Sequence, residues 1–383
     1  MLHQPPLVRA LRRAPLKALA FFHRNTVLCV AALLAALSAF AVRPDEAYLG
    51  YFDFKTLACL FSTLAVVAAF KHIDFFYIIA SGIVRAFRNT RACVLALVWI
   101  TFIGSMLIAN DMALITFLPL SIFVLKNCPD RRTVAFSFVM QNIAANLGGM
   151  LTPFGNPQNL YLYSRFAIPN DAFLLTMFPS FALAVTLITV CCLVFVPKKE
   201  LAVEEERKPL DPARSAAYGV LFVLSVGMVF RVLPYPVGLA AVALSLLFLD
   251  RRALCEVDFG LLFTFVFFFI LAGNAARMPF VRDLLESLLS RGEFLVSTLS
   301  CQFISNVPTA VLLSRFTENW RPLLVGVNVG GVGTLVASLA SLITFREFTA
   351  RYPENTKTYF ALYSALSFAF LAVLIAFNLL MGV

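Results

Sequence analysis

One carboxylate lies deep inside an apolar stretch of this sequence, where it can carry ion chemistry. Asp111 follows Asn110 near the middle of residues 92–125, which contain no other charged side chain. An ionisable residue within a membrane segment indicates an ion or proton path. Because no Arg, Lys or His lies at a similar depth in the sequence, we expect Asp111 to be neutral or to lie beside a bound cation. The alternative is that Asp111 only caps the helix formed by residues 112–125.

A motif of the form N-x-G-G-x-x-T occurs twice, at residues 146–152 and again at 328–334. The first copy runs into Pro153, Gly155 and Pro157, which cannot continue a regular helix. Backbone groups freed by such a break are tolerated in a membrane only where protein buries them or water reaches them. Free N–H groups at a helix start suit an anion, whereas carbonyls with Asn and Thr side chains suit a cation such as sodium. The alternative is that these glycines only allow helices to pack closely.

Composition indicates which environment the elements around these residues need. The chain has 383 residues, of which 61% are hydrophobic and 14% are charged, and its mean hydropathy is +0.87. A soluble domain would need more polar surface, and apolar runs of membrane-spanning length recur along the whole chain. The net charge of +10 comes from basic residues between these runs, which indicate membrane topology rather than nucleic-acid binding. The sequence therefore predicts an all-α polytopic membrane protein.

The apolar runs predict nine full crossings and two hairpins. We expect crossings at residues 27–42, 54–70, 133–165, 171–197, 215–232, 233–249, 258–276, 320–345 and 358–380. Two further stretches, each divided near its middle by polar residues, are predicted to be re-entrant hairpins: residues 92–125, divided at Asn110-Asp111, and residues 293–316, divided at Ser305-Asn306. Residues 72–88 are expected along the membrane surface.

The basic residues predict the orientation of these crossings. With the N-terminus inside, 22 of the 31 Lys and Arg residues fall on the cytoplasmic side, so we expect an inner (plasma) membrane protein with a cytoplasmic N-terminus. Five crossings separate residues 27–42 from their apparent partner, 233–249. This odd number predicts two inverted-topology repeats, each with a re-entrant hairpin and a broken transmembrane helix.

The predicted organisation has four parts: a cytoplasmic basic interfacial segment (1–24), a first inverted repeat (27–197), a cytoplasmic linker (198–214) and a second inverted repeat with one extra helix (215–383). Residues 1–41 also fit a signal peptide loosely, which is the alternative for this segment.

Features of an enzyme are sparse. The three histidines lie outside the predicted crossings, and the sequence has no paired carboxylates at depth, no G-x-S-x-G motif and no phosphate-binding loop. The eight cysteines form no C-x-x-C pair, so neither a zinc site nor another cofactor is expected. The chain is predicted not to be an enzyme, and a membrane-embedded enzyme is a distant alternative.

Four segments resemble the ion transporter superfamily, in its citrate-transporter-like branch. They are ANDMALITFLPL (109–120), NLGGMLTPFGNPQN (146–159), SNVPTAVL (305–312) and NVGGVGTLVASLASL (328–342). The branch includes divalent-anion:sodium symporters, arsenite permeases, sodium/proton antiporters and the melanosomal P protein. Dicarboxylate members carry Ser-Asn-Thr at both hairpin tips, whereas the tip at residues 109–111 reads Ala-Asn-Asp and resembles the arsenite permeases and antiporters.

The resemblance implies that two hairpin tips and two broken helices bind the substrate and a coupling ion. By motif, the substrate and ion site would comprise Asn110, Asp111, Asn146, Thr152, Gly155, Asn156, Pro157 and Asn159 from the first half. From the second half it would comprise Ser305, Asn306, Pro308, Thr309, Asn328, Gly333, Thr334, Ser338 and Ser341. Sodium is expected at Asn110, Asp111 and Asn306. The resemblance also implies a scaffold that often dimerises, so a homodimer is expected.

Together, these features predict a secondary active transporter. We expect it to move a small inorganic or organic anion, of the citrate or dicarboxylate class, coupled to sodium or protons by alternating access. The alternative within transport is a sodium/proton antiporter that uses Asp111.

Overall fold

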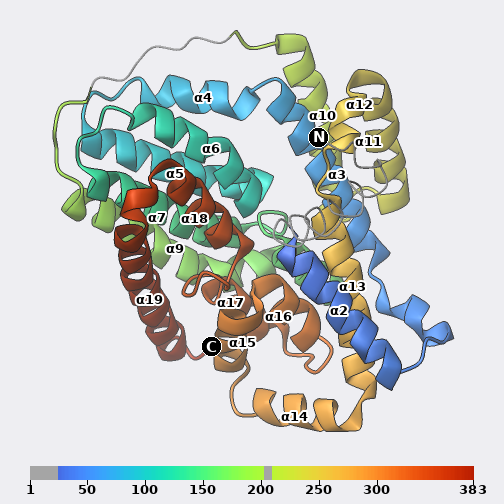
Figure 1. Cartoon of the computed structure of the whole chain (residues 1–383). Helices are drawn as coiled ribbons and strands as arrows, with labels where there is room; N and C mark the ends of the chain where they lie inside the picture. The colour runs from blue at the N-terminus through green and yellow to red at the C-terminus, as the bar shows by residue number, and fades with distance from the viewer. Residues whose placement is uncertain (1–24, 202–208) are drawn as a thin grey trace, which may run out of the picture.

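The computed structural model describes residues 25–201 and 209–383, and this part of the chain is built of helices (Figure 1). Within it, the only β-type pairing is an isolated bridge between Asn89 and Glu200. The predicted interfacial segment 1–24 and residues 202–208 of the predicted linker lie outside the described residues. The prediction of an all-α polytopic membrane protein is confirmed.

The first half contributes eight α-helices and two short 3₁₀ helices. In chain order these are α2 (Thr26–Ala41), η1 (Glu46–Tyr51), α3 (Phe54–His72), α4 (Phe75–Val84), α5 (Thr90–Ile108), α6 (Asn110–Val124), α7 (Arg131–Gly148), η2 (Gly149–Leu151), α8 (Pro157–Arg165) and α9 (Asn170–Phe195).

The second half follows in a similar order and ends with a long helix. Its elements are α10 (Pro212–Val229), α11 (Tyr235–Leu249), α12 (Arg251–Cys255), α13 (Phe259–Arg277), α14 (Pro279–Leu289), α15 (Glu293–Ile304), α16 (Asn306–Leu313), α17 (Trp320–Val329), α18 (Leu339–Arg351), η3 (Pro353–Asn355) and α19 (Thr356–Leu380).

Seven helical segments of the described residues are long and apolar enough to cross a membrane. They contain α3, α5, α7, α9, α10, α13 and α19. Helices α2 and α11 have 16 and 15 residues, which correspond to about 24 and 22 Å of rise against roughly 30 Å of bilayer core. The predicted nine crossings, the orientation and the re-entrant course of the hairpins therefore stay predictions.

Polar caps fix where many of these helices begin. Asp53 accepts a hydrogen bond from Thr56 N at 2.9 Å, and Asp258 accepts one from Leu261 N at 2.9 Å. Asp and Asn are favoured at such positions because their side chains satisfy free N–H groups of the first turn. The Asp-Phe dipeptides at 53–54 and 258–259 thus start α3 and α13 in the same way.

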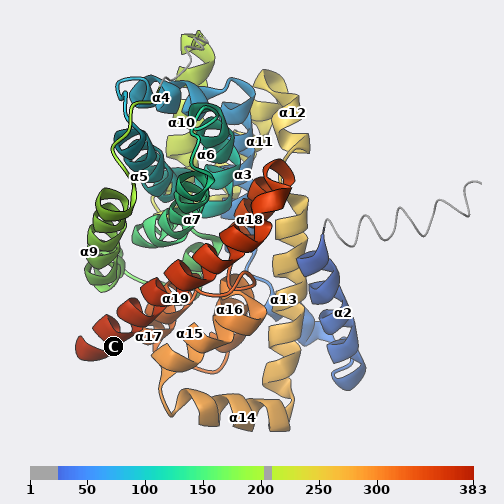
Figure 2. The same cartoon turned by 60° about the vertical axis from the view of Figure 1, so that its left-hand side comes forward.

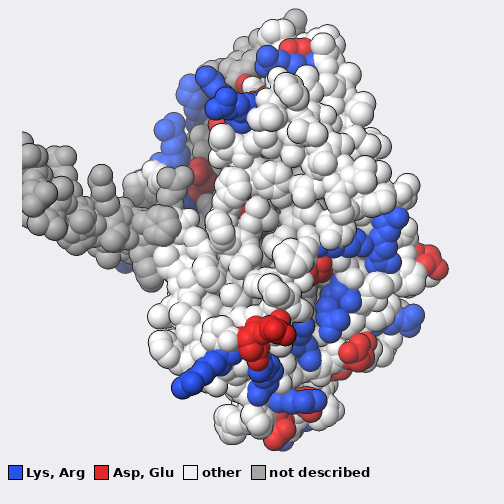
Figure 3. Space-filling model, turned by 90° about the vertical axis from the view of Figure 1, so that its right-hand side faces the viewer, with Lys and Arg blue, Asp and Glu red and all other residues white. Residues whose placement is uncertain are grey.

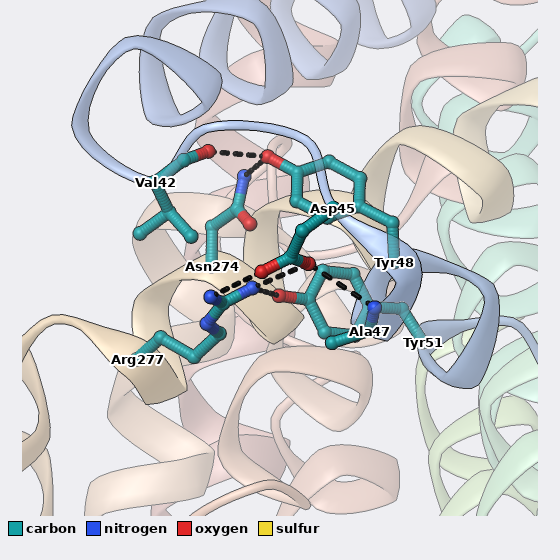
Figure 4. Close-up of polar contacts among 7 residues, drawn as sticks. All are labelled: Val42, Asp45, Ala47, Tyr48, Tyr51, Asn274 and Arg277. Atoms are coloured by element: carbon teal, nitrogen blue, oxygen red, sulfur yellow. Dashed lines mark hydrogen bonds and ion pairs between the residues drawn. The ribbon is translucent and has the colours of Figure 1, made fainter.

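Helices α2 and α13 run side by side and are joined at the end away from their first residues (Figure 4). Arg277 binds the Asp45 carboxylate at 2.6 and 2.9 Å and donates to Tyr51 Oη at 3.0 Å. The hydrogen bond from Arg277 holds the pKa of Asp45 below its ordinary value. Asn274 donates to Ser38 Oγ and to Tyr48 Oη, each at 2.9 Å. These contacts fix α13, whose other end carries Asp258.

Helices α4 and α14 lie across opposite ends of the molecule. In Figures 1 and 2, α4 is at the top and α14 at the bottom, and both run across the direction of the longer helices. Charged side chains gather toward these two ends in Figure 3, with a broad area of uncharged residues between them. This is the distribution that a membrane-spanning protein needs, because charged groups avoid the hydrocarbon core.

One histidine was expected outside the crossings but ends one of the long helices. His72 is the last residue of α3, where Nδ1 lies 2.7 Å from Asp250 Oδ2 and Nε2 lies 3.1 Å from Glu256 Oε2. The last residue of α3 thus has partners at both ends of α12, because Asp250 caps its start and Glu256 follows its last residue.

Candidate functional site

Each of the two predicted hairpins turns at a single residue. Ala109 joins α5 to α6 with φ 65° and ψ 151°, and Ser305 joins α15 to α16 with φ 72° and ψ 158°. Positive φ is uncommon for residues other than glycine, so two turns of the same unusual shape are a specific correspondence between the halves.

The hypothesis that Asp111 only caps a helix is wrong. Helix α6 begins at Asn110, and its cap position is held by Ala109, which makes no side-chain cap. Asp111 lies inside the first turn, and its N–H donates to Asn110 Oδ1 at 3.0 Å. The Asp111 Oδ1 atom is buried and has no hydrogen-bond partner within the described residues.

Both turns are attached to the broken helices by matching backbone hydrogen bonds. Asn110 N donates to Gly155 O at 3.2 Å, and Asn306 N donates to Ala337 O at 3.0 Å. Gly155 lies in the break between α7 and α8, and Ala337 lies in the break between α17 and α18. Each hairpin turn is therefore held against the break of its own half.

The two motif threonines form a second matched pair of contacts. Thr152 Oγ1 donates to Met106 O at 2.7 Å, and Thr334 Oγ1 donates to Gln302 O at 2.9 Å. In both halves the hydroxyl ties the broken helix to the last turn of the first hairpin arm. These hydrogen bonds hold the break of each half against its own hairpin, and a role of either threonine in binding a ligand stays a prediction.

A network of buried amides joins the two halves behind the hairpin turns. Asn110 Nδ2 donates to Asn146 Oδ1 at 3.2 Å within the first half. Between the halves, Asn156 Nδ2 donates to Asn328 Oδ1 at 3.3 Å, and Asn328 Nδ2 donates to Asn159 Oδ1 at 2.6 Å. All five of these asparagines are at most 3% exposed. Buried polar groups with partners specify one arrangement, because losing one partner leaves the other unsatisfied.

A cavity of about 140 Å³ lies in front of this network. It reaches from the hairpin turns to the end of the bundle where α2 and α13 begin. Seven of the predicted site residues line it: Asn110, Asp111, Pro157, Ser305, Asn306, Pro308 and Ser338. The other ten lie outside the lining, in the amide network, in the breaks, or, for Thr309 and Ser341, within α16 and α18: Asn146, Thr152, Gly155, Asn156, Asn159, Thr309, Asn328, Gly333, Thr334 and Ser341.

Six polar residues of the lining were not predicted: Asn25, Thr26, Gln158, Asp258, Thr264 and Arg346. Gln158 belongs to the N-P-Q-N segment that ends the first break, so its position in the motif could have indicated it. Asp258 belongs to the Asp-Phe dipeptide that opens a helix in each half. Nothing in the sequence around Arg346, well inside α18, indicates that it lies near Asp111.

The charge of the cavity differs from the expectation of an isolated carboxylate. Asp111 shares the cavity with Asp258 and with Arg346, which makes an interaction of its own. The sequence hid this because these residues lie on α6, α13 and α18, which only the packed structure brings together. Asp111 therefore has a second carboxylate and a basic group in its cavity, although it has neither in its own apolar stretch of the sequence.

Helices α2 and α13 begin at one end of the cavity, and four other helices, α6, α8, α16 and α18, begin at the hairpin turns and breaks. The first residues or caps of these four, Asn110, Asn306, Pro157 and Ser338, all line it. Helix starts carry partial positive charge and unpaired N–H groups. The buried oxygens Asp111 Oδ1 and Gln158 Oε1 have no hydrogen-bond donor within the described residues. The arrangement therefore offers positive helix ends and unpaired oxygen atoms in one space.

Comparison with known proteins agrees with this architecture. The family model described as "Citrate transporter" matches residues 18–324. An uncharacterized transporter of Methanocaldococcus jannaschii, MJ0456, is 29% identical over 299 residues, which are 77% of this chain and 81% of that protein. The inner membrane protein YbiR of Escherichia coli is 29% identical over 318 residues, or 81% and 84% of the two chains.

A shorter similarity extends to a plant protein. The silicon efflux transporter LSI3 of Oryza sativa is 29% identical over 140 residues, which are 36% of this chain and 28% of that protein. The family match covers most of the chain and includes the first N-x-G-G segment; it ends at residue 324, before the second. The chain belongs to the citrate transporter family of membrane transporters.

Proposed function

We propose that this protein is a secondary active transporter that moves a small anion across the inner membrane, coupled to sodium or protons. One observation carries the proposal: the starts of α6, α8, α16 and α18 meet in one cavity between the two halves with the buried Asp111 Oδ1, which has no partner in the described part of the chain. An anion and a cation can then be held in the same space, which coupling requires. No covalent chemistry is involved.

The helix starts supply the anion half of this site. Backbone N–H groups of a first turn bind carboxylate, phosphate and similar oxyanions, because the helix dipole adds a partial positive charge. At the starts of α6 and α16 the N–H groups of Asn110, Asp111, Asn306 and Val307 are already paired, so these two helices contribute their dipoles. Helices α8 and α18 begin at the far sides of the two breaks. Arg346 adds a full positive charge to the lining.

Asp111 supplies the cation half. A buried carboxylate without a hydrogen-bond donor is costly when charged, so it gains most from a bound proton or metal ion. Emptying the cation position would then leave an unfavourable charge beside the anion site. Binding of the two ions is therefore linked, which is the basis of symport.

Alternating access is the proposed mechanism. The corresponding turns at Ala109 and Ser305, the paired threonine contacts and the placement of α4 and α14 at opposite ends are what two inverted repeats would produce. The cavity opens toward the end where α2 and α13 begin, which is the cytoplasmic side in the predicted topology. Exchanging the conformations of the two repeats would open the other side.

Sodium/proton exchange is the second candidate. It is favoured by Asp258, the second carboxylate that shares the cavity with Asp111. In this case no anion would be carried, and one cation would replace the other at the carboxylates.

Flux measurements distinguish the two functions. The purified protein is placed in liposomes, and a panel of citrate, dicarboxylates, arsenite and silicic acid is offered under imposed sodium or pH gradients. Uptake of one solute that depends on either gradient is expected. Sodium-driven proton movement with no solute uptake would identify the exchanger. The absence of solute, sodium and proton fluxes in a monodisperse protein would refute transport.

A further inference from the structure

We propose that Gln158 and Asp258 complete a sodium site with Asp111. This inference rests on the proposed function, because it assigns the coupling ion and two of the residues that hold it. Gln158 and Asp111 would supply oxygen ligands at depth, and Asp258 would supply a second negative charge nearer the opening of the cavity.

Gln158 is the residue that points to a ligand. It is the second residue of α8 and only 1% exposed, yet its Oε1 atom has no hydrogen-bond donor within the described residues. It also lines the same cavity as Asp111. A buried amide oxygen without a donor is unfavourable, and a cation in the cavity would satisfy it.

Asp111 presents a second such oxygen. Its Oδ1 atom is buried and unpaired in the described part of the chain, on the first turn of α6. Asn156, the cap of α8, also has a buried Oδ1 that is unpaired among the described residues, but this atom lies against Gly149 and outside the cavity. Two oxygen acceptors without donors in one cavity, on Asp111 and Gln158, suit a hard cation, which prefers oxygen ligands.

Asp258 places a further negative charge beside them. Asp111 and Asp258 both line the main cavity and also a smaller one next to it, whereas Arg346 lines the main cavity only. Asp258 Oδ1 accepts from Leu261 N, and Oδ2 makes no hydrogen bond or ion pair within residues 25–201 and 209–383. The carboxylate therefore keeps one oxygen for an ion while it caps α13.

The size of the charge favours a monovalent ion. Two carboxylates at different depths and one arginine leave the cavity with little net negative charge. The described residues contain no group of three or more His, Cys, Asp or Glu side chains that would hold a metal ion. Divalent ions are usually bound by more carboxylate oxygens than this.

Sodium binding to the purified protein tests the site directly. Binding of radioactive sodium is measured in detergent, with choline replacing unlabelled sodium in the buffer. We expect Gln158→Leu, which removes the oxygen at similar volume, to weaken sodium affinity by about tenfold or more. Asp258→Asn keeps a helix cap and removes the charge, and we expect a loss of about threefold to tenfold.

Two further variants keep the result interpretable. Asp211→Asn changes a matched cap, since Asp211 Oδ1 accepts from Arg214 N at 3.1 Å at the start of α10 and lies outside the cavity; its sodium affinity should equal that of the parent. Gln158→Glu retains the oxygen, so it should bind sodium at least as tightly as the parent even if Gln158→Leu fails to fold.

Parent-like affinity in both Gln158→Leu and Asp258→Asn would overturn the proposed site. So would a parent protein that binds no sodium but transports its solute on a pH gradient, although the proposed transport function would then stand. Conversely, sodium binding that the variants weaken, in a protein that moves no solute or proton, would support the site and refute the transport function.

Discussion

Asn328 Nδ2 donates a 2.6 Å hydrogen bond to Asn159 Oδ1, and this bond joins the broken helix of the second half to that of the first. Asn328 lies near the end of α17 and Asn159 in the first turn of α8. Asn328 Oδ1 also accepts from Asn156 Nδ2, so this one side chain holds two residues of the opposite half. The site is therefore built across the junction of the halves rather than within either one.

Removing this junction should destabilise the protein. Asn328→Ala leaves Asn159 Oδ1 without its donor, which costs about 1–3 kcal/mol, and removes one of the two acceptors of Asn156 Nδ2, which keeps Asn146 O. We expect a lower unfolding temperature in detergent and loss of substrate uptake. Asn319→Ala is the control, since Asn319 is exposed and makes no side-chain cap at the start of α17. An unfolding temperature like that of the control would contradict a structural role for the network.

Changes at Asp111 should separate coupling from folding. Asp111→Asn keeps the shape of the side chain and removes its charge, while the turn keeps the Asn110 Oδ1 contact to residue 111 N. We expect near-normal folding and loss of the dependence of transport on sodium or pH. Asp111→Ala should behave alike, because Asp111 is not the cap of α6. Transport by Asp111→Asn that remains fully driven by both gradients would rule out a coupling role.

The two motif threonines should be equally important. Thr152→Val and Thr334→Val each remove a hydroxyl that ties a broken helix to its hairpin, at a cost of about 1–2 kcal/mol. Thermal unfolding of both variants is compared with Thr186→Val, whose hydroxyl bonds only within the exposed face of α9. If only one of the two variants has a lower unfolding temperature than the control, the two matching hydrogen bonds do not contribute equally to stability, and the prediction is wrong.

Gly333→Ala should be poorly tolerated. Gly333 has φ +131°, a conformation that residues with a side chain rarely adopt, and an added Cβ would collide with the side chain of Gln302. Strain and overpacking of this kind cost about 1–3 kcal/mol. Gly219→Ala is the control, because Gly219 lies in α10 and an added Cβ there meets nothing within 4 Å. The fraction of monodisperse protein and the unfolding temperature are measured for each variant. Equal values for Gly333→Ala and Gly219→Ala would contradict the prediction.

The accessibility of introduced cysteines to a thiol reagent should report the membrane topology. Ala213→Cys and Ser287→Cys place thiols on exposed positions at the start of α10 and on α14, in a background where the exposed Cys255 is replaced by Ser. The inverted-repeat hypothesis requires a membrane-impermeant thiol reagent to label residue 287 in intact cells and residue 213 only after lysis. Labelling of both positions in intact cells would refute it.

Local chemistry explains why much of the architecture could be predicted from the sequence. Apolar runs require helices in a membrane because backbone groups must pair within the segment. Pro157 and the glycines before it end α7 and start α8, and the polar pairs at Asn110-Asp111 and Ser305-Asn306 coincide with the two turns. The helix-start aspartates 53 and 258 were also visible, as matching dipeptides.

Other features depended on packing between distant segments, which no local pattern encodes. The turn of the first hairpin falls at Ala109, one residue before the polar pair Asn110-Asp111. Ala109 therefore occupies the cap position of α6, and Asp111 does not cap this helix. Thr152 and Thr334 bond to hairpin carbonyls that only the folded chain brings near them.

The composition of the cavity was decided by tertiary structure alone. Asp258 caps a helix, which its sequence context predicts, but the packing of α13 against α2 and α16 also puts it into one cavity with Asp111 and Gln158. Charges interact through space, so the sequence determined which ionisable groups the chain has and which helices carry them. Only the packed helices determined which of those groups share a cavity, because that depends on distances between residues far apart in the chain.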